Sequence, residues 1–145
     1  MDILQRVAAK AVIVRNGKIL ILREAATYGE GTQRGRYHMP GGRVEIGEHF
    51  EAALRREVRE ETGLEITIEE PLYVGEWRPV IKGQPNQIIG IFFVCRPTTA
   101  DITLSTEHDS YEWIDPARQA DFDIMDPEDL VIEQYLQSRR TRSSN

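Results

Sequence analysis

One short segment, residues 42–64, constrains this chain more than any other part of it. The segment reads GRVEIGEHFEAALRREVREETGL. Within it Glu57, Glu60 and Glu61 follow the spacing i, i+3, i+4, which places three carboxylates on one side of a helix. Like charges at this spacing destabilise a helix by about 0.2–0.5 kcal/mol per pair. A cation that prefers oxygen ligands would turn this cost into a binding site, and Mg²⁺ is the first candidate.

The same segment predicts where the helix lies. Its apolar periodicity indicates a helix from about residue 49 to residue 61, and Thr62–Gly63 supplies a stop at the C-terminal end. On a helical wheel, Glu57 and Glu61 share one face with the apolar residues of the segment. Because an unpaired carboxylate is costly to bury, this face indicates a functional site better than it indicates a solvated acidic surface.

The rest of the chain predicts strands on both sides of that helix and a second helix near the end. Strands are expected at residues 7–15, 18–23, 37–39, 87–96 and 111–114, and at 65–80 in two pieces broken at Pro71. Asn16–Gly17 predicts a hairpin turn, and the glycine-rich residues 25–36 predict a mobile surface loop. A helix should begin at Asp126–Pro127 and run to about residue 137, leaving residues 138–145 as a frayed tail. The pattern is that of an α/β protein with a mixed sheet between helices, in a single domain over residues 1–145.

Charge and composition exclude several classes of function. The 18 basic and 24 acidic residues give a formal charge of −6, which disfavours long nucleic acid as a partner but is compatible with a small anionic ligand bound through metal ions. The single cysteine, Cys95, cannot form an internal disulfide, and its apolar surroundings predict a buried thiol. We find neither a secretory signal nor an apolar stretch near the roughly 20 residues of a membrane helix. A cytoplasmic location without a membrane partner is therefore expected, and a homodimer stays open.

Residues 42–64 resemble the Nudix box and match that motif at every defined position. Upstream, residues 37–42 (YHMPGG) are similar to the family's Trp-x-Phe/Leu-Pro-Gly-Gly entry, with Tyr37 in the place of tryptophan. The resemblance implies a Nudix hydrolase with an α/β/α sandwich around a central mixed sheet. It also implies Mg²⁺-dependent hydrolysis, with Mn²⁺ as an alternative ion, of the pyrophosphate linkage in a nucleoside diphosphate derivative or a nucleoside triphosphate.

The resemblance also suggests roles for individual residues around the metal. Glu57 and Glu61, one helical turn apart, are expected as direct metal ligands. Glu60 would be a further ligand or would orient the attacking water, and the carbonyl group of Gly41 would join the metal ligands. For the general base, Glu57, Glu60 and Glu107 remain open, since only their placement in three dimensions can decide.

Further residues are expected to support catalysis or to contact the substrate. Arg56 belongs to the catalytic set as the residue that pairs with Glu48 and holds the preceding loop on the helix, in the bidentate geometry that suits arginine. His38 and His49 show no metal-ligand spacing and are expected in surface or packing positions. The expected substrate-binding residues are Arg23, Arg34, Arg36 and Tyr37.

The identity of the substrate stays open between two classes. Pro79 lies 15 residues after Leu64 and resembles a marker of the branch that cleaves ADP-ribose. A small single domain equally suits the removal of oxidised or non-standard nucleoside triphosphates. An RNA 5′-end pyrophosphohydrolase is a further alternative, which the acidic charge disfavours. A non-catalytic nucleotide-sensing Nudix module is another, and the complete set of carboxylates disfavours it.

Overall fold

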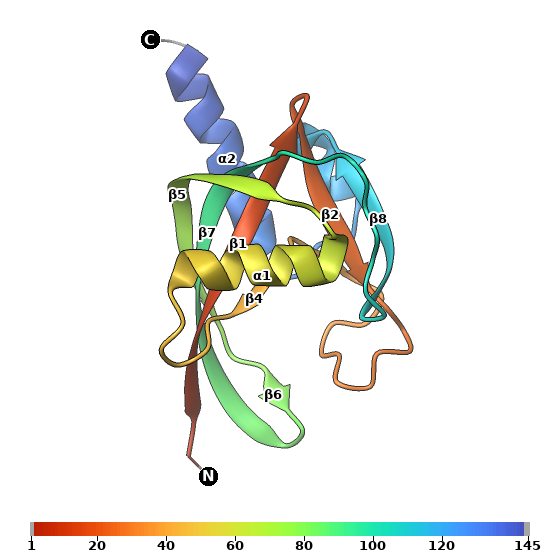
Figure 1. Cartoon of the computed structure of the whole chain (residues 1–145), viewed down its shortest axis with the longest axis vertical. Coiled ribbons are helices and arrows are strands. Elements are labelled where there is room, and N and C mark those ends of the chain that lie inside the picture. The colour runs from red at the N-terminus through yellow and green to blue at the C-terminus, as the bar shows by residue number, and fades with distance from the viewer. Residues whose placement is uncertain (1, 144–145) are drawn as a thin grey trace.

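The computed structural model describes residues 2–143 and places a mixed sheet between two helices (Figure 1). The elements in chain order are β1 Leu4–Arg15, β2 Lys18–Glu24, β3 Tyr37–His38, β4 Gly41–Arg43, α1 Phe50–Thr62, β5 Ile66–Trp77, β6 Val80–Ile81, β7 Gln84–Pro97, β8 His108–Ile114, the 3₁₀-helix η1 Pro116–Asp121 and α2 Glu128–Ser143. Neither α1 nor α2, over the residues that are described, is long and apolar enough to span a membrane.

The long strand β1 joins the two parts of the sheet. Along residues 4–13 it pairs in parallel with β7, which carries antiparallel β5 on its other side. Near its start β1 also pairs with β4, and at its end it turns through Asn16 and Gly17 into β2. Both turn residues have positive φ, 53° and 75°, as expected for the predicted two-residue hairpin. Strand β2 then pairs with β3 and β8, so parallel and antiparallel pairs occur in one sheet.

The two faces of the sheet are covered by different helices, with α1 in front of the sheet and α2 behind it in Figure 1. Successive side chains of a strand point to opposite faces. Val12 of β1 therefore belongs to the core with Val131 of α2, whereas its neighbour Ile13 belongs to the core with Leu54 of α1. The expected α/β/α sandwich is confirmed, and Cys95 is buried in the core beneath α1.

The boundaries of α1 agree with the prediction to within one residue. His49 caps the start of the helix, where its ring accepts the N–H of Glu51. Gly63 ends it in the left-handed conformation with φ 75°, and its N–H donates to the carbonyl of Arg59. Glycine adopts this conformation without the steric cost that a side chain adds. The helix therefore ends directly after Glu61, the last of its three clustered carboxylates.

Two predictions about the other elements are wrong. Strand β5 runs continuously through Pro71, which pairs with Phe93 of β7 between two register shifts that accommodate the proline. Helix α2 continues to Ser143, past its predicted end at about residue 137, and residues 144–145 of the expected frayed tail lie outside the described part. Arg139 and Arg142 of α2 both pair with Glu70 of β5, which holds this last part of the helix on the sheet.

Candidate functional site

A polar pocket of about 240 Å³ lies where α1 meets the β3–β4 corner and the loops that follow β2 and precede β8. Its lining residues are Glu24, Tyr28, His38, Gly41, Gly42, Arg43, Glu57, Glu61, Glu107 and His108. Four carboxylates and one guanidinium group therefore share one cavity. Such an excess of negative charge in a confined space favours cations, and oxygen ligands favour hard cations such as Mg²⁺.

The Gly41–Gly42 turn lets the backbone approach both the sheet and α1. Gly41 has φ 135°, and a Cβ atom there would lie 2.4 Å from the carbonyl oxygen of Ala9. A Cβ atom on Gly42 would lie 2.6 Å from Cδ of Glu57. Real Cβ atoms do not come so close to other heavy atoms, so Gly41 lets β4 pair tightly with the backbone of β1, and Gly42 lets the Glu57 carboxylate lie against the turn.

Glu61 is buried with one oxygen unsatisfied. Its side chain is 5% exposed. Its Oε1 accepts the N–H of Gly41 at 3.2 Å, while its Oε2 has no hydrogen-bond partner among residues 2–143. Burial raises the pKa of Glu61 well above its ordinary value; nearby Lys10 opposes the rise and Glu57 adds to it. A buried carboxylate oxygen without a partner is costly, so this donor set fits a divalent cation that would complete it.

Arg56 organises the start of the helix, as predicted. It makes a bidentate pair with Glu48, with Nε–Oε2 at 2.9 Å and Nη2–Oε1 at 3.0 Å. Its Nη1 also donates to Oε1 of Glu57 at 2.9 Å. One guanidinium group thus holds the loop before α1 and orients a pocket carboxylate. Glu60 lies only at the margin of this arrangement: its side chain is 59% exposed and it is absent from the pocket lining.

The Arg56–Glu48 pair predicts a measurable titration. Hydrogen bonds from Arg56 lower the pKa of Glu48 from 4.5 to about 2. Because the folded pKa is the lower one, the pair stabilises the fold above the unfolded pKa, and this contribution is lost as pH falls through the folded pKa. Arg56→Ala should return the Glu48 titration, followed by carboxyl ¹³C NMR, towards 4.5. Arg59→Ala, which removes the partner of Glu65 instead, is the control. An unchanged Glu48 titration in Arg56→Ala would contradict the assigned cause.

Glu107 reaches the pocket from the loop before β8. Its pKa is raised, first by partial desolvation and then by the negative charges of Glu57, Glu60, Glu24 and Glu30. The side chain itself is solvent-exposed at the pocket rim. A carboxylate with a raised pKa that is open to water has the properties of a general base.

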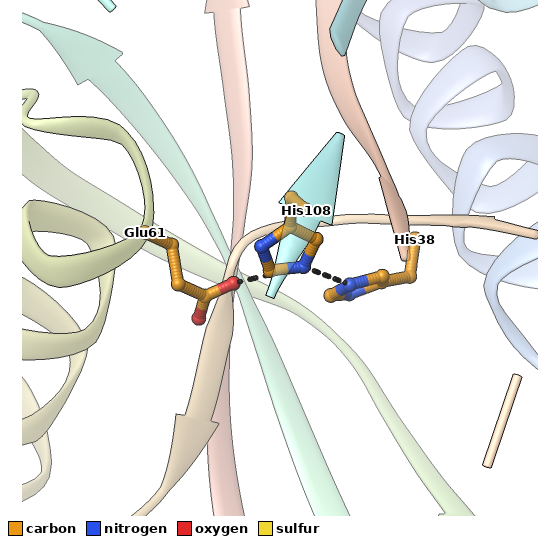
Figure 2. Close-up of side chains that lie close together, drawn as sticks. All are labelled: His38, Glu61 and His108. Carbon is orange, nitrogen blue, oxygen red and sulfur yellow. Dashed lines mark hydrogen bonds and ion pairs between the residues drawn. The ribbon is translucent and has the colours of Figure 1, made fainter. Parts of the chain in front are cut away.

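A row of buried polar side chains continues from Glu61 into the core, and Figure 2 shows its first three members. Nε2 of His108 lies 3.6 Å from Oε2 of Glu61 and 2.7 Å from Nε2 of His38. Nδ1 of His38 lies 3.2 Å from Nζ of Lys10, which forms an ion pair of 3.0 Å with Glu128 at the start of α2. Burial lowers the pKa of His38 well below its usual value and that of His108 to about 4, so both rings are neutral at pH 7.

This polar row decides between the two positions expected for His38. The histidine is expected at the surface or in a packing position, and it is buried, in polar contacts at the pocket that its sequence position did not indicate. His108 is 70 residues away in sequence and Lys10 is 28, so no local spacing indicates these contacts. His49 is at the surface, as expected, where it caps α1.

The residues predicted to bind substrate do not line the pocket. Arg23 pairs with Asp109 at 2.7 Å, and Arg36 pairs with Asp123 at 3.1 Å. Tyr37 packs edge-on against an aromatic ring of the core. The sequence analysis instead missed Tyr28 and Arg43, which do line it.

Arg34 stabilises the loop that follows β2. Its side chain donates to the carbonyl groups of Tyr28 and Gly29 at 2.7 and 2.8 Å, so it holds one wall of the pocket from outside. Tyr28 belongs to this same loop, and no sequence signal separated it from its neighbours. Arg43 directly follows Gly41 and Gly42. This position within the Nudix box was the sequence signal that could have identified Arg43 as a pocket residue.

Comparison with known proteins identifies relatives along nearly the whole chain. The NUDIX domain profile matches residues 4–135. A nucleoside triphosphatase NudI from Salmonella agona (strain SL483) is 29% identical over 130 residues, covering 83% of this chain and 89% of that protein. A MutT-like protein from Streptomyces ambofaciens is 30% identical over 114 residues, covering 78% of this chain and 66% of that protein.

Solved structures are similar in fold at lower identity. A MutT protein from Methanosarcina mazei Go1 superposes with a TM-score of 0.82 at 22% identity, covering 96% of this chain and 98% of that one. An ADP-ribose pyrophosphatase from Streptococcus suis 89-1591 has a TM-score of 0.64 at 17% identity, covering 89% and 85% of the two chains. At these identities the likeness concerns the fold alone.

Proposed function

The chain belongs to the NUDIX domain family and is a Nudix pyrophosphohydrolase, and we propose that it hydrolyses a nucleoside triphosphate with the help of divalent metal ions. One observation carries the proposal: Glu57, Glu61 and Glu107 converge on a single pocket together with Arg43. The similarity to a NudI nucleoside triphosphatase supports the triphosphate as substrate.

The proposed metal ligands are Glu57, Glu61 and the carbonyl group of Gly41, with Mg²⁺ as the ion and Mn²⁺ as the alternative. The unsatisfied Oε2 of buried Glu61 and the close approach of Glu57 to the glycine turn both support this choice. When bound, such ions neutralise phosphate oxygens and make water more acidic. Glu60, exposed and outside the lining, is assigned an auxiliary role in attracting the cation.

Glu107 is the general base that the arrangement favours. Glu57 is engaged by Arg56 at 2.9 Å, and Glu60 lies outside the lining, whereas Glu107 is at the rim with a raised pKa. It takes a proton from water as the water oxygen bonds to phosphorus. The attacked phosphorus is one of the two joined by the bridge between the α- and β-phosphates, and its bond to that bridging oxygen breaks at the same time, so a triphosphate yields a nucleoside monophosphate and pyrophosphate. Arg56 positions Glu57 and does not itself contact the substrate.

Arg43 and Tyr28 are the groups best placed to receive the triphosphate. Arg43 is the guanidinium group that lines the pocket, and it suits phosphate oxygens because it offers several N–H donors in a planar array. Tyr28 adds an aromatic ring and a hydroxyl group from the loop after β2. These two residues replace the arginines that the sequence suggested, since Arg23 and Arg36 pair with aspartates and Arg34 holds the loop after β2.

ADP-ribose is the second candidate, on the strength of Pro79. This residue lines a separate pocket of about 210 Å³ with Trp77, Arg78 and residues of the loop after β2. An aromatic ring beside a proline can accommodate the distal part of a dinucleotide-like substrate. Pro79 does not line the catalytic pocket, so it would affect substrate affinity rather than the reacting groups.

A substrate panel with Mg²⁺ tests the proposal. We expect kcat/KM for a canonical or oxidised nucleoside triphosphate to exceed that for ADP-ribose by about tenfold or more, which corresponds to about 1.4 kcal/mol in the barrier. Products are separated by chromatography, and pyrophosphate release is followed directly. Dinucleoside polyphosphates and 5′-triphosphorylated RNA complete the panel.

The opposite ranking would reverse the choice of substrate. Faster cleavage of ADP-ribose would place it first, and Pro79→Ala should then raise KM for ADP-ribose with little change in kcat. Binding of nucleotides without turnover of any of them would indicate a sensing module and would contradict the proposed hydrolysis altogether.

A further inference from the structure

At the wall of the catalytic pocket, two histidine nitrogens lie close to one carboxylate oxygen, a set of donors different from carboxylates alone. They come from His38, His108 and Glu61, one ligand atom from each, and they lie within 4.8 Å of one another. We propose that these residues form a second metal site, selective for a borderline divalent cation of the Zn²⁺ class. The site shares Glu61 with the proposed Mg²⁺ ligands, but its test does not depend on hydrolysis.

The distances are close to those that such an ion requires. Zinc binds histidine nitrogen at about 2.0–2.1 Å and carboxylate oxygen at about 2.0–2.2 Å, so ligand atoms lie about 2.9 Å apart at right angles and about 3.4 Å apart in a tetrahedron. The two Nε2 atoms are 2.7 Å apart, and Nε2 of His108 is 3.6 Å from Oε2 of Glu61. Shifts of a few tenths of an ångström bring these two distances into range, and the ligand atoms of His38 and Glu61 lie within 4.8 Å of each other. Figure 2 shows His108 between the other two side chains.

Two of the three ligands, His38 and Glu61, have the supporting contacts usual at protein metal sites, whereas Nδ1 of His108 has no hydrogen-bond partner among the described residues. A metal-binding histidine usually donates its second ring N–H to a backbone carbonyl or a carboxylate. Nδ1 of His38 lies 2.9 Å from the carbonyl oxygen of Met39. Glu61 is held through its other oxygen by the N–H of Gly41. Both histidine rings are neutral at pH 7 because burial lowers their pKa, and neutral imidazole is the form that binds metals.

Without a cation the same atoms are imperfectly matched. Lys10 has only donors, so its contact with Nδ1 of His38 makes that atom an acceptor and places the proton on Nε2, where it can donate to His108. Oε2 of Glu61 then faces an accepting nitrogen and has no partner among the described residues. A cation removes this mismatch: the His38 proton moves to Nδ1 and donates to Met39, and Lys10 keeps its ion pair with Glu128.

The two sets of ligands predict different ion preferences. Magnesium prefers oxygen and retains water, whereas imidazole nitrogen favours Zn²⁺, Co²⁺ and Ni²⁺. The site formed by His38, His108 and Glu61 should therefore bind such ions even when Mg²⁺ is in large excess. The side chains of all three are buried, so the ion would be shielded from bulk solvent.

Cobalt binding gives the first test. The whole protein is titrated with Co²⁺ in excess Mg²⁺, and the visible absorption of the bound ion is recorded. We expect one Co²⁺ per chain, displaced by Zn²⁺, with affinity at least about tenfold lower in His38→Gln and in His108→Gln. His49→Gln alters the third histidine of the chain, which caps α1 at the surface, and it should bind as the wild type does. Unchanged affinity in both ligand variants would overturn the site.

Histidine NMR gives a second test that needs no variant. With three histidines in the chain, each imidazole is resolved by its ring ¹⁵N signals. One equivalent of Zn²⁺ should shift Nε2 of His38 and of His108 and leave His49 in place. Rings that do not move would overturn the site even if the variants failed to fold. Hydrolysis with Mg²⁺ alone is measured separately. Failure to bind Zn²⁺ or Co²⁺ would therefore leave the proposed hydrolysis intact, and absence of hydrolysis would leave the second metal site intact.

Discussion

Glu57→Gln and Glu61→Gln should each lower kcat/KM for the nucleotide substrate by roughly 10²–10³-fold, the effect typical of losing one electrostatic group aimed at the reacting charge. Each change keeps the shape of the side chain and removes a negative charge from the pocket. Neither should unfold the protein: Glu57 lies at the pocket wall, and neutral glutamine at position 61 avoids the cost of burying a charge.

The measurement is steady-state kinetics over a range of Mg²⁺ concentrations, with circular dichroism to confirm the fold. Glu51→Gln is the matched control, because Glu51 is an exposed glutamate in the first turn of the same helix. Excess chelator should abolish turnover of the wild type. If both variants retain wild-type rates, or if hydrolysis persists in chelator, the assignment of these carboxylates to the metal is wrong.

Glu107→Gln should lower kcat by about 10²–10⁴-fold, the usual contribution of a general base. It should also change the pH profile. A base acts only when deprotonated, and the pKa of Glu107 is raised from 4.5 by desolvation and by its acidic neighbours. The kcat/KM of the wild type should therefore rise with pH through an apparent pKa above 4.5 and then level off. The variant should lose this rising limb.

The control for this prediction lies on the adjacent strand. Glu112→Gln changes an exposed carboxylate of β8 that does not line the pocket, and it should keep both the rate and the pH profile. If kcat/KM of Glu107→Gln still rises with pH as it does in the wild type, the general base is another residue. Glu57 would then be the next choice, because of the other two candidates for the general base it lines the pocket and Glu60 does not.

The sequence by itself determined the features that depend on neighbours along the chain. The spacing of Glu57, Glu60 and Glu61 predicted one helical face, Gly63 predicted the end of α1, and both follow from contacts within one or two turns. The pair between Arg56 and Glu48 was predictable for the same reason, since eight residues separate them. The family, the fold class and the Arg56–Glu48 pair follow from this local information, and the proposed metal ligands rest on it.

Only the tertiary structure decided which of these carboxylates share a cavity and what surrounds them. Glu107 and His108 join the pocket because β8 pairs with β2, and His38 joins it because β3 pairs with β2 from another side. The sequence suggested Arg23 as a phosphate ligand, but the same pairing of β2 with β8 places Asp109 beside it, and the two side chains form an ion pair. Strand register and crossover connections set these contacts between residues that are 70 or more positions apart in the sequence. Helical or strand periodicity carries no information at such separations.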